Sequence, residues 1–247
     1  MLTAVCVTAS ETGAVRKDNQ DTVFVDKAKT VFCVADGMGG GSEGATASRF
    51  VCEEIEKAVA VKALAERMEA VEAAITAAND RIRAYAKERD FKQMGSTAAV
   101  LLLDPSDNIR AAICHVGDSR IYRIRLRKAE LLTHDHTIGG QLGDLTKGIM
   151  AAGFKSRTNP LAHVLTRAIG AADKVEGDWK KIDVAAGDRF LICSDGVHDV
   201  VSDERIGTIL SGLEGLKDAS KRLSDEIVRS GAPDNFSYVM VGVGGGQ

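Results

Sequence analysis

The stretch "TVFCVAD" at residues 30–36 ends in an acidic residue and leads into "GMGGG" at residues 37–41. Its apolar, partly β-branched residues ended by Asp-Gly are typical of a β-strand that stops at a loop. Similar runs occupy residues 22–26, 97–104, 110–118, 120–126, 189–195 and 236–243. Only the short turn-like "PSDNI" separates two of these runs, which favours antiparallel hairpins because parallel strands need a longer crossover.

Three segments show the apolar spacing of amphipathic helices. Over residues 62–90 the apolar positions recur at intervals of four and three, and residues 43–60 and 203–230 follow the same pattern. The longest stripe covers only about three heptads, which favours a helix packed on a sheet over a coiled coil. The alternation of strand-rich and helical segments predicts a layered α+β fold with a sheet core.

Composition limits the class of protein. The chain has 247 residues, of which 45% are hydrophobic and three are proline, and it contains no Ser- or Pro-rich linker, so we predict one domain over residues 1–247. A net charge of −3 argues against nucleic-acid binding, and no apolar run is long enough for membrane insertion. Five cysteines without a close pair predict a reducing cytoplasm, and nothing requires more than a monomer.

Five aspartates stand where the predicted strands begin or end. Asp36, Asp118 and Asp195 close apolar runs, whereas Asp21 and Asp234 directly precede them. Each alone is typical of a turn, but strand ends in antiparallel sheets share an edge, so the five side chains could converge. Two carboxylates about 4 Å apart repel by about 4 kcal/mol at an effective dielectric of 20, so such a cluster requires a cation. Oxygen ligands without His or Cys select Mg²⁺ or Mn²⁺.

A phosphate-binding loop is the alternative interpretation of "DGMGGG". A Walker-type loop ends in Lys followed by Ser or Thr, and neither follows these glycines. A dinucleotide-binding loop matches only loosely, and Asp36 would stand where it repels a pyrophosphate. The metal-binding interpretation is therefore favoured.

Eight short motifs follow one another along the chain: "RKDNQD" (16–21), "VADGMGG" (34–40), "GSTA" (95–98), "VGDSRIY" (116–122), "LTHDH" (132–136), "LTRAIG" (165–170), "LICSDGV" (191–197) and "PDNFS" (233–237). This ordered set resembles the metal-dependent serine/threonine protein phosphatases, the PPM or type 2C family, in their compact bacterial form. The resemblance implies a four-layer α-β-β-α sandwich, in which helix pairs flank two antiparallel sheets. It also implies a variable flap over residues 137–160.

The resemblance assigns roles to the acidic residues. Asp36 is expected to bridge two Mg²⁺ or Mn²⁺ ions, with the Gly37 carbonyl joining one of them. Asp195 and Asp234 are expected to complete the first ion's ligands, and Asp21 belongs to the surroundings of the second. The glycines after Asp36 are expected to let the backbone turn, so that Asp36 and the Gly37 carbonyl both face metal.

Further positions follow from the same resemblance. Asp118 matches a residue that helps to hold a third, weaker ion, and Arg16 matches the arginine that grips the substrate phosphate. Met38 stands where many eukaryotic members have a histidine that donates a proton, so the leaving alcohol is expected to take its proton from metal-bound water. His134 and His136 are expected to make structural hydrogen bonds, and His163 is placed to contact substrate.

The predicted function is hydrolysis of phosphoserine and phosphothreonine in proteins by a water held between two metal ions. The expected substrates are phosphoproteins made by a Ser/Thr kinase. Two other interpretations stay open at this point. One is a catalytically silent phosphatase-fold domain that binds phosphoproteins, although every expected ligand aspartate is present. The other is a metal-dependent hydrolase of small phosphoesters.

Overall fold

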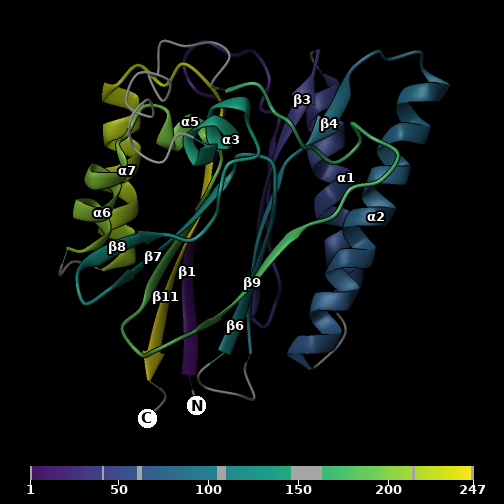
Figure 1. The fold of residues 1–247 in the computed structure, drawn as a ribbon. Helices are drawn as coiled ribbons and strands as arrows, with labels where there is room; N and C mark the ends of the chain where they lie inside the picture. The colour runs from purple at the N-terminus through teal and green to yellow at the C-terminus, as the bar shows by residue number, and fades with distance from the viewer. Residues whose placement is uncertain are drawn as a thin grey trace.

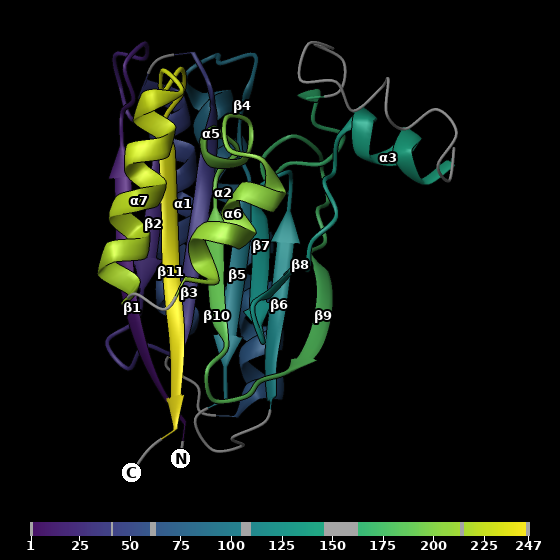
Figure 2. The ribbon, with the colours of Figure 1, turned by 90° about the vertical axis from the view of Figure 1, so that its left-hand side faces the viewer.

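A computed structural model describes residues 2–40, 42–59, 63–104, 110–145, 163–212 and 215–245. Figure 1 shows two β-sheets packed face to face, with a helical layer on the outer side of each. The view in Figure 2, turned by 90°, shows the strands of both sheets running roughly along one direction. The predicted α+β sandwich of two antiparallel sheets and flanking helices is therefore confirmed.

The first sheet joins the two ends of the described chain. Its strands, in spatial order, are β1 (Leu2–Glu11), β11 (Phe236–Gly245), β10 (Arg189–Cys193), β7 (Arg120–Arg125) and β8 (Lys128–Leu131). All neighbouring strands are antiparallel. β1 and β11 pair along their full lengths, from Leu2 opposite Gly245 to Glu11 opposite Phe236.

The second sheet contains most of the apolar runs that the sequence analysis identified. Its strands, in spatial order, are β2 (Asp21–Val25), β3 (Val31–Gly39), β5 (Ala98–Leu103), β6 (Arg110–Val116) and β9 (Asp178–Asp183). The short strand β4 (Met94–Ser96) pairs with the last three residues of β3. These pairings too are antiparallel.

Helices cover the outer face of each sheet. α1 (Ser42–Ala58) and α2 (Leu64–Glu88) share one hydrophobic core with the second sheet. α5 (Asp195–His198), α6 (Asp203–Leu210) and α7 (Leu216–Arg229) share another core with the first sheet. None of the helices in the described part of the chain is both long and apolar enough to cross a bilayer.

The two faces of each sheet explain why the strands are apolar at successive positions. In β3, Val31, Cys33 and Ala35 belong to the core under α1 and α2. The alternate residues Phe32 and Val34 belong to a third core, which lies between the two sheets. Because successive strand residues point to opposite faces, a strand buried on both faces reads as a continuous apolar run. The same alternation fixes which face each later polar residue of the strand occupies.

The structure differs from the sequence prediction at several elements. Residues 203–230, predicted as one helical block, form the two helices α6 and α7, and Gly212 and Gly215 lie between them, where glycine disfavours a continuous helix. The strands β1, β4, β8 and β9 were not predicted. β8 and β9 are short edge strands with charged residues, so they lack the apolar pattern of the central strands.

The segment expected as a flap, residues 137–160, is described only in its first part. There the chain forms α3 (Ile138–Leu145), and Figure 2 shows this helix standing outside the four layers. The remainder of the expected flap, residues 146–160, lies outside the described residues. Backbone hydrogen bonds connect the start of α3 to the chain that follows, because Ile138 N–H donates to Val164 O at 3.0 Å.

Candidate metal centre

The alternation of strand residues brings two aspartates together in the second sheet. Asp21 on β2 is the direct partner of Asp36 on β3 in the antiparallel ladder, so their side chains lie on the same face. Asp36 is in phase with Phe32 and Val34, which belong to the core between the sheets. Both carboxylates therefore enter the gap between the two sheets, at the end where the apolar core stops.

Asp195 and Asp234 reach the same gap from the first sheet. Asp195 follows β10 and is the first residue of α5, and Asp234 lies just before β11. The carboxyls of Asp36 and Asp195 are close enough to share a hydrogen bond. Carboxylates from both sheets thus meet at the end of the sandwich opposite the N and C labels in Figure 1.

Burial and neighbouring negative charges raise the pKa values of the aspartates in this group. Burial, followed by the charge of Asp195, raises the pKa of Asp36 well above its ordinary value. Burial also raises the pKa of Asp195, with Asp199 adding to the rise. Each carboxylate disfavours ionisation of the next, so the group holds protons unless a cation replaces them.

Asp21 shows the need for a cation most directly. Only 8% of its surface is exposed, and burial raises its pKa to about 7, against two side-chain hydrogen bonds that lower it. Ser194 Oγ donates one of these bonds to Asp21 Oδ2 at 2.8 Å. Oδ1 is buried without a hydrogen-bond partner among the described residues. A buried carboxylate oxygen without a partner is costly, which makes it a candidate ligand for an ion.

Asp118 lies on the connection between β6 and β7 and is 7% exposed. Burial raises its pKa well above the ordinary value, and Asp195 is the largest of the charges that raise it further. It therefore belongs electrostatically to the same acidic group. Its backbone carbonyl accepts a hydrogen bond from His198 Nε2 at 3.1 Å, if that nitrogen carries the ring proton.

Arg16 contacts this group through Asp234. Arg16 Nη2 donates to Asp234 Oδ2 at 2.7 Å, and more than half of the arginine side chain is exposed. Asp234 Oδ1 accepts from the backbone N–H of Asn235 at 2.8 Å. The predicted phosphate-binding arginine thus stands at the open side of the cluster, paired with one of its carboxylates.

The expected turn after Asp36 was wrong. β3 continues through Gly39, with Gly37, Met38 and Gly39 paired to β4, so the backbone stays extended past Asp36. The absence of a side chain at Gly37 serves close packing instead. A Cβ there would lie 1.9 Å from the carbonyl oxygen of Gly44, in the first turns of α1. Glycine therefore lets the start of α1 approach the strand that carries Asp36.

The donor atoms of this group fit a hard divalent cation. The carboxylates of Asp21, Asp36 and Asp195 are oxygen donors, and each has a pKa raised by burial and by neighbouring acids. Oxygen ligands and high negative charge suit Mg²⁺ and Mn²⁺. A cation would remove the repulsion and give the unpartnered Asp21 oxygen a ligand role, so the residues fit the expected metals.

Three supporting residues were missed by the sequence analysis. Thr97 bonds both backbone groups of Asp36, because its Oγ1 accepts from Asp36 N–H at 3.0 Å and its N–H donates to Asp36 O at 2.8 Å. Asn235 connects the loop that carries Arg16 to β11 by donating to Thr12 O and accepting from Gln20 N–H. The third is Ser194. Each lies inside a motif already quoted, so proximity to the aspartates was the available signal.

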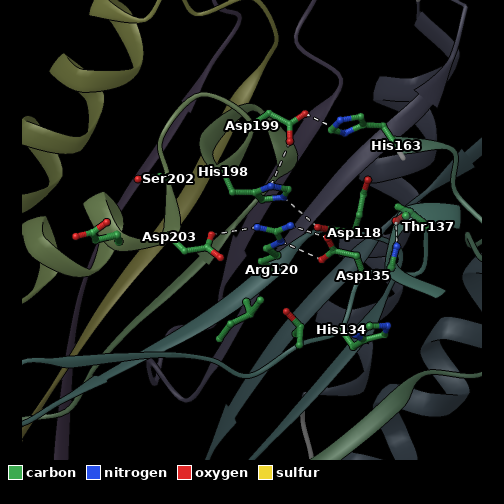
Figure 3. A pocket seen from close by; sticks show the side chains of 15 residues that line it. Asp118, Arg120, His134, Asp135, Thr137, His163, His198, Asp199, Ser202 and Asp203 are labelled. Carbon is green, nitrogen blue, oxygen red and sulfur yellow. Dashed lines mark hydrogen bonds and ion pairs between the residues drawn. The ribbon is translucent and has the colours of Figure 1, made fainter. Parts of the chain in front are cut away.

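A cavity of about 450 Å³ adjoins the acidic group (Figure 3). Asp118 forms part of its wall. The other lining residues come mainly from the end of β8, the segment between β8 and α3, the start of α3, and the stretch from the end of α5 to the start of α6. His163 lines it and lies 3.4 Å from Asp199, measured from Nδ1 to Oδ2. Arg120 binds Asp135 across the cavity wall with two hydrogen bonds of 2.6 and 2.9 Å.

His136 has the structural hydrogen-bonding environment that the sequence analysis expected, and Met38 is a packing residue. Met38 Cε would be 2.5 Å from a Cβ at Gly95, so the thioether packs over that glycine. His136 is buried and hydrogen-bonded through both ring nitrogens. His134 lines the cavity, and its backbone carbonyl and N–H lie 2.7 and 3.3 Å from Nε2 of His115.

Comparisons with known proteins agree with the motif order. A sequence profile of the protein phosphatase 2C family matches residues 8–231. The serine/threonine protein phosphatase PstP of Mycobacterium tuberculosis is 32% identical over 237 residues, which are 95% of this chain and 44% of PstP. The chain thus spans less than half the length of that relative. Protein phosphatase PhpP of Streptococcus pneumoniae is 28% identical over 94% of each chain.

A solved structure agrees over the whole sandwich. The catalytic domain of the phosphatase PstP, in complex with two manganese ions, has a TM-score of 0.85 to this chain at 30% identity. The alignment covers 99% of this chain and 100% of that domain. With a profile match over most of the sequence and the expected sandwich, the family predicted from the motifs is confirmed: the chain belongs to the protein phosphatase 2C family.

Proposed function

We propose that this chain hydrolyses phosphoserine and phosphothreonine monoesters in proteins, with Mg²⁺ or Mn²⁺ held by the acidic group. One observation carries the proposal. Asp21 and Asp36 are paired across a ladder, Asp195 approaches them from the other sheet, and one buried oxygen of Asp21 has no partner among the described residues. Membership of the protein phosphatase 2C family supports the same activity.

Each acidic residue then has a distinct role. Asp36 lies between carboxylates of both sheets, which supports a bridge between two ions, with the Gly37 carbonyl as a further ligand. Asp195 and Asp234 would hold the first ion with Asp36, and Asp21 would serve the second. Asp118 stands farther along the same group and would hold a third, weaker ion.

The chain's own residues position the phosphate. When bound, the ions supply positive charge that activates water and offsets the charge on the phosphoryl group. Arg16 is half exposed at the edge of the group, and its planar guanidinium can bind two phosphoryl oxygens at once. The thioether of Met38 cannot donate a proton. The leaving alcohol would therefore take its proton from water.

The setting of the proposed activity is a cytoplasmic one. We infer phosphoproteins made by a Ser/Thr kinase as substrates, a monomer as the working form, and residues 1–247 as one domain. The core shared by the two sheets supports the single domain. All five cysteines are free and four are buried, which supports a reducing compartment.

Two other functions make different predictions. A silent domain that binds phosphoproteins would bind a phosphopeptide without releasing phosphate, and it would not need the full set of crowded aspartates. A hydrolase of small phosphoesters would cleave p-nitrophenyl phosphate without preferring peptides. The presence of all five aspartates that are expected to bind metal favours hydrolysis over silent binding.

The test is phosphate release from a phosphothreonine peptide by the full chain, with Mn²⁺, with EDTA and with the variant Asp36→Asn. We expect Mn²⁺-dependent release that EDTA abolishes and that Asp36→Asn lowers at least a hundredfold. Asp218→Asn, which removes an exposed carboxylate on α7, is the matched control and should keep full activity. Absence of metal-stimulated release from a folded protein would refute the proposal.

A further inference from the structure

His136 is bonded to both backbone groups of Gly117, the residue before Asp118. The backbone N–H of Gly117 donates to His136 Nδ1 at 3.1 Å. The backbone N–H of His136 donates to Gly117 O at 3.0 Å. Only 5% of the His136 surface is exposed, so water does not compete for these bonds. One residue therefore fixes the two peptide planes on either side of the Gly117 Cα.

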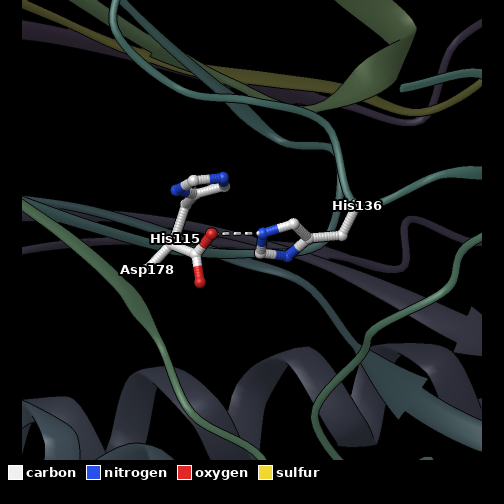
Figure 4. A group of neighbouring side chains, drawn as sticks. All are labelled: His115, His136 and Asp178. Atoms are coloured by element: carbon white, nitrogen blue, oxygen red, sulfur yellow. Dashed lines mark hydrogen bonds and ion pairs between the residues drawn. The ribbon is translucent and has the colours of Figure 1, made fainter. Parts of the chain in front are cut away.

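The ring of His136 is itself held in one orientation. Because Nδ1 accepts from Gly117, the ring proton lies on Nε2, which donates to Asp178 Oδ2 at 3.0 Å (Figure 4). Asp178 is also bound by Arg167. The ring of His115 stacks on that of His136, with centroids 4.6 Å apart and planes inclined by 22°. Asp178, Arg167 and His115, which lie outside the acidic group, thus fix the position of Nδ1 of His136.

The backbone of His136 is fixed as well. Its carbonyl oxygen accepts from Thr166 N–H at 2.8 Å, and the next residue, Thr137, forms an isolated β-bridge with Leu165. His136 therefore belongs to a hydrogen-bonded junction, in which residues 136–137, just before α3, are connected to residues 165–166.

Gly117 is the flexible point that this arrangement restrains. Its φ of +97° is a conformation that other residues rarely adopt, and a Cβ there would lie 2.6 Å from Thr97 Cγ2. Glycine has more backbone freedom than any other residue, so Gly117 alone would allow Asp118 to take several directions. The backbone N–H of His136 fixes the peptide plane between Gly117 and Asp118, and the His136 side chain fixes the peptide plane before Gly117. Both planes together set φ and ψ of Gly117, so loss of the side-chain bond frees the direction in which Asp118 starts.

A metal site is the competing interpretation of the same side chains. His115, His136 and Asp178 offer ligand atoms within 4.8 Å of one another. A metal on Nε2 of neutral His136 would place the ring proton on Nδ1, opposite the N–H of Gly117. Arg167 also already neutralises Asp178. The hydrogen bonds therefore favour a supporting network over an ion.

We propose that His136 is a positioning residue that restrains Gly117 and so directs the Asp118 carboxylate towards its ion. The inference rests on the proposed function, in which Asp118 holds the third, weaker ion. His136 does not contact substrate or metal. Its effect is transmitted through two backbone hydrogen bonds, so it is selective for the ion that Asp118 binds.

Two substitutions at this position separate the roles of the two ring nitrogens. In Asn, Oδ1 lies near the place of Nδ1 and can still accept from Gly117 N–H, whereas in Gln the amide reaches the place of Nε2 and keeps only the contact with Asp178. We expect His136→Gln to weaken the third ion at least fivefold, with the two tighter ions within twofold of wild type. His136→Asn should keep all sites within about twofold.

The measurement is calorimetric titration of the metal-free full chain with MnCl₂, together with the melting temperature of each variant. Binding is read directly, so absence of phosphatase activity would refute the proposed function without deciding this inference. A double variant with Asp118→Asn provides the second arm. If His136 acts through Asp118, His136→Gln should change manganese binding by less than twofold in that background.

Several outcomes would overturn the inference. One is equal weak-site affinity in His136→Gln and His136→Asn, because the Gly117 bond would then be irrelevant. A second is an undiminished effect of His136→Gln in the Asp118→Asn background. A third is a wild-type chain that binds no third manganese ion. Lower melting temperatures with unchanged manganese binding would show a purely structural role.

Discussion

Asp21 and Asp36 are direct partners across the β2–β3 ladder, and both carboxylates enter the gap between the two sheets. Like charges directly opposite on a ladder destabilise a sheet. Ser194 satisfies one oxygen of Asp21, and the other has no partner among the described residues. The fold thus keeps an unfavourable pair at a position where a cation would make it favourable.

Manganese should stabilise the protein, and more strongly at pH 8 than at pH 5.5. The pKa of Asp21 rises from its ordinary 3.8 to about 7 on folding, so the metal-free protein loses stability as the pH rises through this range. At the higher pH, protons compete less with Mn²⁺ for the Asp21 carboxylate. At a hundredfold excess over the dissociation constant, binding adds about 2.7 kcal/mol, or roughly 5–10 °C in melting temperature.

Thermal melts with and without Mn²⁺ at each pH check this prediction. Burial lowers the pKa values of His115 and His136, which destabilises the folded protein at low pH, but this contribution is common to both melts and cancels in the difference. An equal or larger manganese shift at pH 5.5 would contradict the account.

Replacement of Arg16 by Ala should affect substrate rather than folding. We expect KM for a phosphopeptide to rise about tenfold, because the guanidinium no longer binds the phosphoryl group, with manganese binding intact. The exposed Arg16–Asp234 pair contributes less than about 1 kcal/mol to stability. Steady-state kinetics of Arg16→Ala, with the exposed neighbour Lys17→Ala as control, test this. Unchanged kinetics would remove Arg16 from the phosphate site.

Two glycines of the opening stretch should respond differently to Ala. A Cβ at Gly37 would meet backbone atoms of Gly44 at 1.9 and 2.4 Å, so α1 has to move away from β3. We expect a loss of about 2–3 kcal/mol in the free energy of unfolding. Gly40 has nothing within 4 Å of its Cβ position, so Gly40→Ala should change stability by less than about 0.5 kcal/mol. Urea denaturation of both variants is the measurement, and equal losses would refute the packing role of Gly37.

The Arg120–Asp135 pair should matter more than an exposed ion pair. Both side chains are only 19% exposed and share two hydrogen bonds, so Arg120→Ala leaves a largely buried carboxylate without its partner. We expect a loss of about 3 kcal/mol, against about 0.5 kcal/mol or less for Lys221→Ala in the exposed pair with Asp225. Similar losses in the two variants, measured by urea denaturation, would contradict this difference.

The sequence contained most of the information about the sheet and the acidic group. The apolar runs predicted the central strands, and the aspartates at their ends predicted the acidic group that the two sheets bring together. The alternation within "TVFCVAD" also determines the face of Asp36, because it is in phase with Phe32 and Val34. The turn expected at Gly37 was wrong because pairing with β4 keeps β3 extended, and β4 itself is only three residues long.

Other features depend on contacts that no local pattern reveals. The edge strands β8 and β9 are charged and become strands only because β7 and β6 supply their hydrogen-bond partners. The bonds between His136 and Gly117 join residues that lie 19 positions apart in the sequence. The order of motifs predicted that these residues matter, but not what they contact.

An anomalous difference map from crystals grown with Mn²⁺, recorded at the manganese absorption edge, tests the central claim most directly. The account predicts two strong peaks that share Asp36, one beside Asp195 and Asp234 and one towards Asp21, with a weaker third peak beside Asp118. A map without a peak at Asp36, or with manganese only between His115, His136 and Asp178, would contradict it.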